Sequence, residues 1–598
     1  MLNLTNNRLN YGDILLGPNN YHLDFAIGTT YSLDLDSLVG VSLALLSGEI
    51  DSDMLNNKVL LLDSLIKNTG KIDLFCENGQ IHTPKNPNPL HILLEKIVFQ
   101  VTNNNFSEHS KFASFHPKFW LLRFIDDNDK VLYRVIVLSR NLTFDRSWDI
   151  SFVIDGKIGE KTTKNNALIY FINELYDLNG KNAIKTDEII SEEKAKKINN
   201  IIEDLEYVQF SLNDSFNDYE FIINNGTNDE YFIQKELLFK EEHLDNLLII
   251  SPFLSNTVIK KFNDKINSNS KAILITQADS LLELSCEDCS NFDVYTVRQE
   301  IIDGETYLPK DAQYVSNQDV HAKIYLAQHE NCSELYLGSL NASCNALKSN
   351  VEFMVKLSAS SDEVNVKKIS ESLFDVDGEN PFEKVDWSKI NNKKENKDND
   401  FSDKIKYLVR LESKVIVISC ENYYNIELEF KDLDMDKFND LDVTIQPLFV
   451  KKSYKLNNIL IFKNLDKKKL SEFFIVTINK KFKRVIKIPT EGMPDDRFDE
   501  VISSIINNDT DFLLYVSYLL GDEFVFDDFD FEGDGDSLAI GQYNVQLPEL
   551  YEKMLKASYY NPDKFDEIDV LINSLSEDNM IDCFNEFKEL YDTFKEVL

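Results

Sequence analysis

An internal repeat constrains the fold of this chain more than any other feature of its sequence. Two segments share, in the same order, a His-x-Lys triplet, a Ser-x-Asn triplet and an acidic residue before an apolar run. Corresponding residues lie 200 to 205 positions apart, a separation too constant to arise easily by chance. The repeat therefore predicts two copies of one structural unit. The first copy reads Phe115-His-Pro-Lys, Ser139-Arg-Asn and Trp148-Asp, and the second reads Val320-His-Ala-Lys, Ser339-Leu-Asn and Val351-Glu.

The spacing within each His-x-Lys triplet is suited to binding a phosphate. Side chains two positions apart on a strand lie on the same face, so His116 and Lys118 point into one space, as do His321 and Lys323. A pseudo-twofold axis between the copies would place two imidazoles and two ammonium groups around one phosphorus. One histidine can then attack the phosphorus while the other protonates the leaving oxygen.

The Ser-x-Asn triplets supply further polar groups to the same site. We expect Asn141 and Asn341 to bind the non-bridging phosphate oxygens together with the lysines, and Ser139 and Ser339 to support that binding. Two alternatives remain open from the sequence. The asparagines could instead cap the helices that follow them, and the serines could serve only the turn.

The acidic residues of the repeat are expected to act through the histidines. A carboxylate behind each imidazole, from Asp149 or Glu352, would fix its tautomer and raise its basicity, although both could also be ordinary charges at a strand edge. No cluster of acidic residues suited to two metal ions accompanies the motifs, so we expect neither a metal nor another cofactor.

The two copies fall where strand-like and helix-like patterns alternate, which is typical of α/β folds. We expect two pseudo-repeated α/β lobes with one shared active site, followed by a small β domain and an acidic helical tail. In the first lobe, the patterns predict helices at 59–66 and 90–101 and strands at 119–124 and 133–138. The expected divisions are a first lobe (1–155), a mainly helical connector (156–240), a second lobe (241–370), a linker (371–403), the β domain (404–490) and the tail (491–598).

The paired motifs resemble those of the phospholipase D superfamily, over residues 21–155 and 240–360. The resemblance implies a covalent phosphohistidine, with His116 and His321 as nucleophile and general acid and a slight preference for His116 as nucleophile. The Asp usually found five positions after each Lys is replaced by Arg123 and Gln328. In this respect the chain is similar to the tyrosyl-DNA phosphodiesterase and nuclease branches. The first copy also has Leu138 where the second has Gly338.

The same resemblance implies a metal-independent phosphodiesterase, specifically a nuclease, in a bacterial anti-phage or restriction-type system. The implied partner is nucleic acid, DNA rather than RNA. The chain has no Gly-x-x-x-x-Gly-Lys-[Ser/Thr] loop, so an ATP-driven step would need a helicase or ATPase partner. The alternatives are a non-catalytic binding or scaffold subunit and, less favoured, a lipid phosphodiesterase. No motif encodes the oligomeric state.

The net charge of −39 restricts where nucleic acid could bind. The tail contributes 28 acidic against 6 basic residues, whereas 451–487 is locally basic, so a binding groove must be local. The favoured interpretation of the basic stretch is solvated strand faces. The seven cysteines do not suggest a disulfide framework, and we find neither a signal sequence nor an apolar run of about 20 residues. We therefore expect a cytoplasmic protein without a membrane partner.

Three further motifs have ordinary interpretations. We expect His109-Ser-Lys111 to lie in an exposed loop, because no matched asparagine and acid follow it. Cys286 and Cys289 form a single CxxC without a second pair at zinc-like spacing. The acidic run 527–536 approaches calcium-loop spacing, but Ala539 stands where that loop needs a bidentate glutamate, so a solvated loop is expected.

Overall fold

The computed structural model describes most of the chain. The described residues are 9–47, 57–103, 113–144, 147–177, 184–186, 191–213, 215–225, 243–298, 301–302, 306–307, 319–375, 380–390, 399–520, 547–560, 562, 564–575 and 581–595. The His109 loop, the acidic run 527–536 and most of the lysine-rich part of the expected linker (391–398) lie outside these residues.

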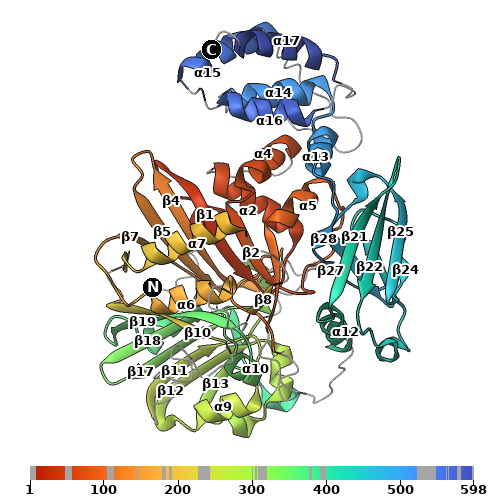
Figure 1. The fold of residues 1–598 in the computed structure, drawn as a ribbon. Coiled ribbons are helices and arrows are strands. Elements are labelled where there is room, and N and C mark those ends of the chain that lie inside the picture. Colours follow the sequence, from red (N-terminus) through yellow and green to blue (C-terminus); the bar gives the residue numbers. More distant parts are fainter. Residues whose placement is uncertain are drawn as a thin grey trace.

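Two eight-stranded sheets form the centre of the molecule (Figure 1). The first has the order β8-β3-β2-β1-β4-β5-β7-β9 and the second the order β10-β19-β18-β17-β11-β12-β13-β20. The strands of the first are β1 Tyr21–Thr30, β2 Ile72–Glu77, β3 Val98–Asn103, β4 Phe119–Asp126, β5 Val131–Leu138, β7 Ser151–Ile158, β8 Ile184–Thr186 and β9 Val208–Ser211. Those of the second are β10 Asp218–Asn224, β11 Leu244–Ile250, β12 Ile266–Thr276, β13 Phe292–Val297, β17 Ile324–His329, β18 Cys332–Gly338, β19 Glu352–Ser360 and β20 Phe382–Lys384.

The repeat seen in the motifs extends to whole sheets. In the first sheet β1 runs parallel to β2 and antiparallel to β4, and β4, β5 and β7 follow as an antiparallel meander. In the second sheet β11 runs parallel to β12 and antiparallel to β17, and β17, β18 and β19 form the equivalent meander. The expected class of two pseudo-repeated α/β lobes is confirmed.

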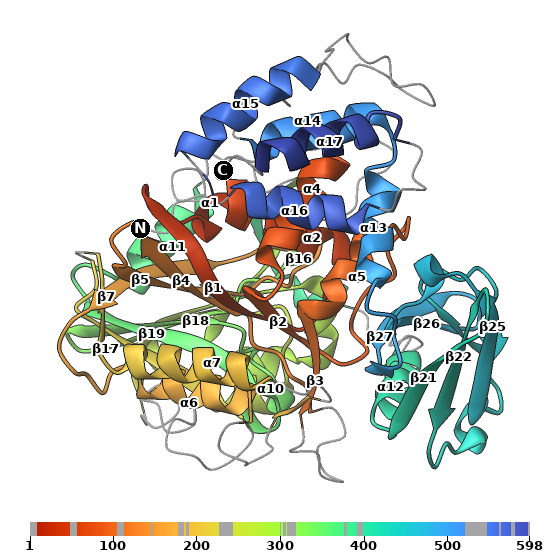
Figure 2. The same cartoon turned by 45° about the horizontal axis from the view of Figure 1, so that its top comes forward.

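One hydrophobic core lies between the two sheets. It joins the inner faces of both to α6 (Asn166–Leu175) and α7 (Glu192–Leu205), which lie side by side in Figures 1 and 2. Helix α7 begins at an N-cap serine, has two glutamates in its first turn, and buries Ile198, Ile201 and Leu205 on one face. Capping and amphipathic spacing thus fix both where this helix starts and which face meets the core.

The outer face of each sheet has its own helical cover. On the first sheet, α1 (Tyr11–Leu15), α2 (Leu35–Ser47), α4 (Lys58–Asn68) and α5 (Leu90–Leu93) share a core with the C-terminal helices. These are α13 (Arg497–Ile505), α14 (Asp509–Leu519), α15 (Leu547–Tyr560), α16 (Lys564–Ser574) and α17 (Phe584–Lys595). On the second sheet, α9 (Asn256–Asn263) and α10 (Cys344–Lys348) pack on the outer face. The acidic tail is therefore packed onto the first lobe.

Some sequence expectations need correction. The expected helix at 90–101 is wrong in its second half, because β3 begins at Val98 and pairs in parallel with β2. Among its described residues the segment 156–240 carries the helices α6 and α7, but its strands β8, β9 and β10 complete the edges of both sheets. The expected linker contains β20, which pairs with β13. Short apolar runs suit a buried strand and a buried helix equally, and pairing with a distant neighbour decides between them.

The small β domain consists of two four-stranded sheets, with orders β25-β22-β21-β28 and β24-β23-β26-β27. It follows α12 (Asn399–Val409) and has its own core. The strands are β21 Ser413–Ser419, β22 Tyr424–Phe430, β23 Val443–Pro447, β24 Tyr454–Lys455, β25 Ile459–Leu465, β26 Phe473–Ile478, β27 Phe482–Lys487 and β28 Thr490–Glu491. It lies beside the first lobe in Figure 1.

Phe353 joins the two lobes in the shared core, and its removal should destabilise both. Its ring centroid lies 4.8 Å from that of Phe119 in the first sheet and 5.1 Å from that of Phe171 in α6, and the side chain is fully buried. We expect Phe353→Ala to lower the free energy of unfolding by about 3–5 kcal/mol. Urea unfolding followed by tryptophan fluorescence tests this. The matched control Phe144→Ala, at a residue 68% exposed, should change it by less than about 0.5 kcal/mol; equal effects would contradict the packing described.

Candidate active site

Backbone hydrogen bonds between the lobes place the two histidines. The His116 amide donates to the Val351 carbonyl at 2.9 Å, and the His321 amide donates to the Trp148 carbonyl at 2.8 Å. Each histidine therefore lies beside the residue that precedes the acid of the other lobe. Short stretches of parallel strand pairing also cross between the lobes. Phe115 pairs with Val351, and β16 (Asp319–Val320) pairs with β6 (Ser147–Trp148).

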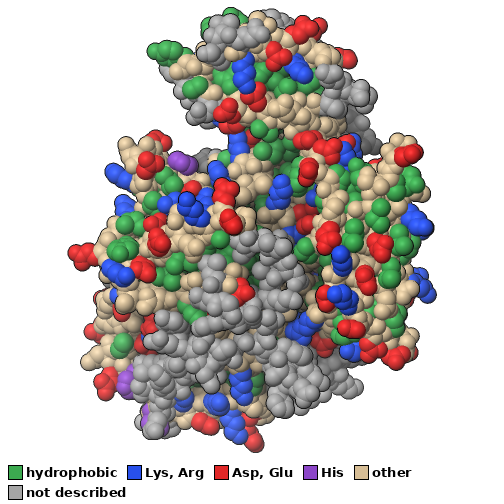
Figure 3. All heavy atoms as spheres, in the orientation of Figure 1, with side chains coloured by type: hydrophobic (Ala, Val, Ile, Leu, Met, Phe, Trp, Pro, Cys, Tyr) green, Lys and Arg blue, Asp and Glu red, His purple; other side chains and the backbone are tan. Residues whose placement is uncertain are grey.

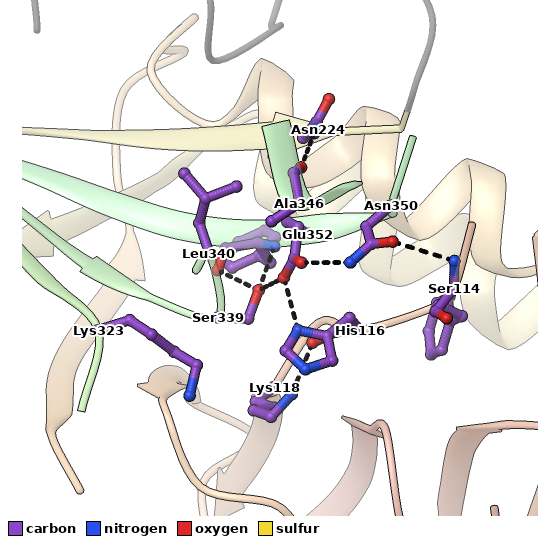
Figure 4. Close-up of polar contacts among 12 residues, drawn as sticks. Ser114, His116, Lys118, Asn224, Lys323, Ser339, Leu340, Ala346, Asn350 and Glu352 are labelled. Atoms are coloured by element: carbon purple, nitrogen blue, oxygen red, sulfur yellow. Dashed lines mark hydrogen bonds and ion pairs between the residues drawn. The ribbon is translucent and has the colours of Figure 1, made fainter. Parts of the chain in front are cut away.

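This exchange brings Glu352 of the second lobe to His116 of the first. The Nδ1 atom of His116 lies 2.9 Å from Oε2 of Glu352, which is 1% exposed (Figure 4). The other carboxylate oxygen accepts a 3.0 Å hydrogen bond from Asn350, and the Asn350 oxygen accepts one from the Ser114 amide at 3.1 Å. The carboxylate that orients His116 is thus held from both lobes.

Asp149 occupies the equivalent place in the first lobe. Its two oxygens accept hydrogen bonds from Ser139 at 2.9 Å and Ser147 at 2.6 Å, and Arg140 lies 3.8 Å away. Because the residue before Asp149 accepts the His321 amide, the acid lies next to the segment that carries the second histidine. The hydrogen bond from Ser139 repeats the one that Ser339 donates to Glu352.

The two lysines are buried at the start of their strands. Lys118 and Lys323 are 1% and 2% exposed, and each ammonium group donates to the carbonyl of the histidine two residues before it. Figure 4 shows Lys323 extending toward His116 and Lys118. Burial, and then the charge of Lys323, hold the pKa of Lys118 well below its usual range. Burial lowers the pKa of Lys323 to about 8, although Asp149 and Glu352 oppose the change.

His116 is an uncharged base at neutral pH. Burial lowers its pKa to about 4, against the opposing effect of Glu352 and with the help of both lysine charges. Burial disfavours the charged form of Glu352, but the field and hydrogen bond of His116 and the hydroxyl of Ser339 lower its pKa below the usual value. We assign the hydrogen bond as Nδ1–H donating to an ionised carboxylate. That assignment leaves Nε2 with its lone pair free.

Neither asparagine of the repeat caps a helix. The N-cap of α10 is Ser343, whose side chain accepts from Ala346, and in the described residues that follow Asn141 the next element is a strand, β6. The Oδ1 atoms of Asn141 and Asn341 are buried and have no hydrogen-bond partner among the described residues. The capping alternative is therefore wrong, and no described residue donates a hydrogen bond to either amide oxygen.

The serines lie behind the acids instead of facing a phosphate. Ser139 and Ser339 are fully buried, and each hydroxyl donates to the acid of its own lobe. Each also accepts a backbone amide, from Ile150 at 2.9 Å and from Phe353 at 3.0 Å. Each serine hydroxyl hydrogen is therefore used in a hydrogen bond to an acid. The expected role of the serines in phosphate binding is corrected: they orient the acids.

The turns before the serines differ in backbone conformation. Gly338 has φ +149°, and a Cβ there would lie 2.4 Å from the Phe353 carbonyl oxygen. Leu138 ends β5, and its amide donates to the Lys118 carbonyl at 2.9 Å. The first turn therefore accepts a side chain that the second excludes.

The two residues that replace the usual aspartates take part in structure. Arg123 binds Asp24 at 2.6 Å and Asp204 at 3.3 Å, and Gln328 accepts the Val366 amide at 3.2 Å. Neither of these contacts reaches a residue of the paired motifs.

Two residues of the site were missed by sequence reasoning. The ring of Tyr31 lies 5.1 Å from that of His116, and the Lys118 ammonium lies 5.8 Å from the Tyr31 centroid. Glu77 is 3% exposed and accepts the Phe115 amide at 2.7 Å, and burial raises its pKa to about 7. Tyr31 follows β1 and Glu77 ends β2, where polar side chains of a parallel sheet gather, so strand-end position was the available signal.

The remaining candidate features are a metal-binding group, the paired cysteines and a membrane-spanning helix. Among the described residues, no three His, Cys, Asp or Glu side chains are grouped so that they could hold a metal ion. Cys286 and Cys289 lie in a short 3-10 helix with a capping box, and neither forms a disulfide. None of the described helices combines the length and apolar composition that crossing a membrane requires.

Removing the charge of Glu352 should disable His116 without unfolding the protein. We expect Glu352→Gln to lower kcat by about 10²- to 10⁴-fold, because the amide can hold the imidazole in the wrong tautomer. Turnover of bis(p-nitrophenyl) phosphate and the melting temperature measure the two effects. The control Glu363→Gln, at an exposed position, should leave both unchanged. Full activity in the Glu352 variant would contradict the assigned role.

No protein-family model matches the chain, and no curated protein matches it. Solved structures with a similar fold include yeast tyrosyl-DNA phosphodiesterase, with 13% identity over 58% of this chain and 85% of that one and a TM-score of 0.34. Phosphatidylserine synthase of Haemophilus influenzae Rd KW20 shows 12% identity over 67% and 89%, with a TM-score of 0.36. Polyphosphate kinase of Porphyromonas gingivalis shows 12% over 58% and 41%, with 0.29. All three are members of the phospholipase D superfamily, the family that the paired motifs resemble.

Proposed function

We propose that this protein is a metal-independent phosphodiesterase that cleaves nucleic acid through a covalent phosphohistidine on His116. The observation that supports the proposal most directly is the neutral His116 imidazole, held by Glu352 of the opposite lobe beside the Lys118 ammonium group. A base with a free lone pair next to buried cations is suited to attack on an anionic ester.

The first step forms the intermediate. The Nε2 lone pair of His116 attacks phosphorus, a P–N bond forms, and the P–O bond to the leaving group breaks. His321 gives a proton to the departing oxygen, so the leaving group departs as an alcohol. Glu352 accepts the Nδ1 hydrogen bond and stabilises the positive charge that develops on the His116 ring.

The second step returns the free enzyme. His321 takes a proton from water, the resulting hydroxide attacks phosphorus, and the P–N bond breaks. The products are a phosphomonoester and neutral His116. Lys118 and Lys323 bind the non-bridging oxygens in both steps, and an anion between them offsets the repulsion and burial that lower their pKa values. The amides of Asn141 and Asn341 are assigned to the same oxygens.

Nucleic acid is the favoured substrate class, and DNA is favoured over RNA by the motif resemblance alone. Because the chain is strongly acidic, a phosphate-binding site needs cations gathered locally. On the face drawn in Figure 3, the described lysines and arginines are interspersed with acidic residues and form no separate basic patch. Within the basic stretch, Lys467 pairs with Asp496 at 2.6 Å and Lys468 with Glu500 at 3.5 Å. These pairs favour ordinary surface charges over a separate nucleic-acid patch. A helicase or ATPase partner and an anti-phage role extend the proposal on the same resemblance.

Both histidines should be needed for turnover of one shared site. We expect His116→Ala and His321→Ala each to lower turnover of bis(p-nitrophenyl) phosphate in EDTA by about 10³-fold or more, and the double variant to be no worse than either. Comparable activity in each single variant, lost only in the double variant, would mean two independent sites. If wild type cleaves neither this ester nor any DNA or RNA tested, the proposed function fails.

The pH dependence of kcat/KM should report His116 and the two lysines. The nucleophile must be neutral, so activity should rise as pH increases through about 4; both lysines must be charged, so activity should fall as pH increases through the lower of their two pKa values, which is no higher than the value of about 8 for Lys323. p-Nitrophenolate leaves without a proton, so the general acid does not contribute to this fall. The double variant Lys118→Arg, Lys323→Arg keeps both charges and should move the fall in activity to higher pH. An unchanged fall in this double variant would refute its assignment to the lysines.

A further inference from the structure

The small β domain reaches the neighbourhood of the active site through its strand β27. The Val485 amide donates to the Ile81 carbonyl at 2.8 Å, and the two residues form an antiparallel bridge. Ile81 pairs in turn with Leu33, and Leu33 pairs with Leu142, the residue after Asn141. Neighbouring strands lie about 4.8 Å apart, so this series of bridges joins the domain to the first catalytic motif over a short distance.

The domain is also fixed firmly to the segments that carry the site. The Lys406 ammonium of α12 donates to the Ser114 hydroxyl at 3.1 Å, two residues before His116. Lys487 is buried and donates to the carbonyls of Glu95 and Val98 in the first lobe. The position of β27 relative to His116 is therefore set by packed, hydrogen-bonded contacts.

Arg484, on β27, is a half-buried cation that forms no ion pair with another described residue. Its Nη1 atom donates to the Lys483 carbonyl at 2.9 Å, and its guanidinium carbon lies 4.5 Å from the Phe482 centroid. Its Nε atom is buried and has no hydrogen-bond partner, and among the described residues the side chain forms no ion pair. Placing a guanidinium in this way costs free energy unless a ligand supplies the missing acceptor.

The electrostatic neighbours of Arg484 belong to the first lobe. Burial lowers its pKa, and the two groups that oppose this are Tyr31 and Asp34. Tyr31 is the residue whose ring contacts the His116 ring. The Asp34 carboxylate is bound by His82 at 2.7 Å and by the Phe144 amide at 3.0 Å, and the described contacts include no hydrogen bond or ion pair between Asp34 and Arg484.

We propose that Arg484 is an anion-binding residue beside the active site, supplied by the small β domain, and that it holds a phosphate of the nucleic-acid strand next to the phosphate that is cleaved. The inference rests on the proposed function for its substrate. A guanidinium presents several donors in a fixed fork and suits a phosphate oxygen pair. The β domain would then select polymeric substrates, because a single small diester has no second phosphate to offer.

The test compares Arg484→Gln with Lys483→Gln, which removes the same charge from the exposed neighbour on the opposite face of the strand. Binding of a fluorescent single-stranded oligodeoxynucleotide is measured by anisotropy in a His116→Asn background, which prevents turnover. We expect the Arg484 variant to weaken binding roughly tenfold and to lower the salt slope by about 0.7, and the Lys483 variant to change neither. In enzymes with His116 intact, kcat/KM for bis(p-nitrophenyl) phosphate should be unchanged by both.

The outcomes separate this inference from the proposed function. Equal binding by both variants, or no binding of the oligonucleotide by the His116→Asn protein, overturns the inference. A matching loss on the small diester also overturns it, because Arg484 would then act on the reacting phosphate or on folding; Arg484→Lys, with melting temperature as readout, distinguishes these two cases. If the Arg484 effect on binding is found but wild type cleaves no phosphodiester, the inference stands and the proposed function fails.

Discussion

The site depends on two backbone hydrogen bonds that cross between the lobes. The amides of His116 and His321 donate to the residues immediately before Glu352 and Asp149, so each lobe completes the other. A site built in this way cannot form in one lobe alone. The shared core around Phe353, into which α6 and α7 also pack, holds the two halves in the register that these hydrogen bonds need.

The second constraint is electrostatic. Lys118, Lys323 and Glu352 are buried, and His116 and Asp149 beside them are largely covered; loss of solvent drives the histidine and both lysines toward their neutral forms. The carboxylates restore part of the charge and are themselves held by serine hydroxyls and an asparagine amide. A bound phosphate would supply the remaining anion. The free site thus presents buried cations to an anionic ligand. Burying these charges costs free energy, which substrate binding offsets.

The sequence predicted the two lobes and the residues that the lobes bring together, because the repeat preserves order, spacing and strand period. It could not predict which acid serves which histidine: Glu352 reaches His116 only through pairing between segments 236 residues apart. The serines were assigned to the phosphate because their hydroxyl partners depend on the same pairing. Tyr31 and Glu77 belong to no motif, and only the folded sheets place Tyr31 against the His116 ring and Glu77 against the Phe115 amide. Local pattern was likewise insufficient at 90–101, where parallel pairing with β2 turns the second half of an apolar run into a strand.

The most direct measurement of the central claim is the site of covalent attachment. In His321→Ala, bis(p-nitrophenyl) phosphate should still react, because p-nitrophenolate needs no proton, but the intermediate should not be hydrolysed. Alkaline quenching and peptide mass spectrometry should then find a p-nitrophenyl phosphoryl group on His116. An adduct on another residue, or none despite release of p-nitrophenolate, would contradict nucleophilic attack by His116.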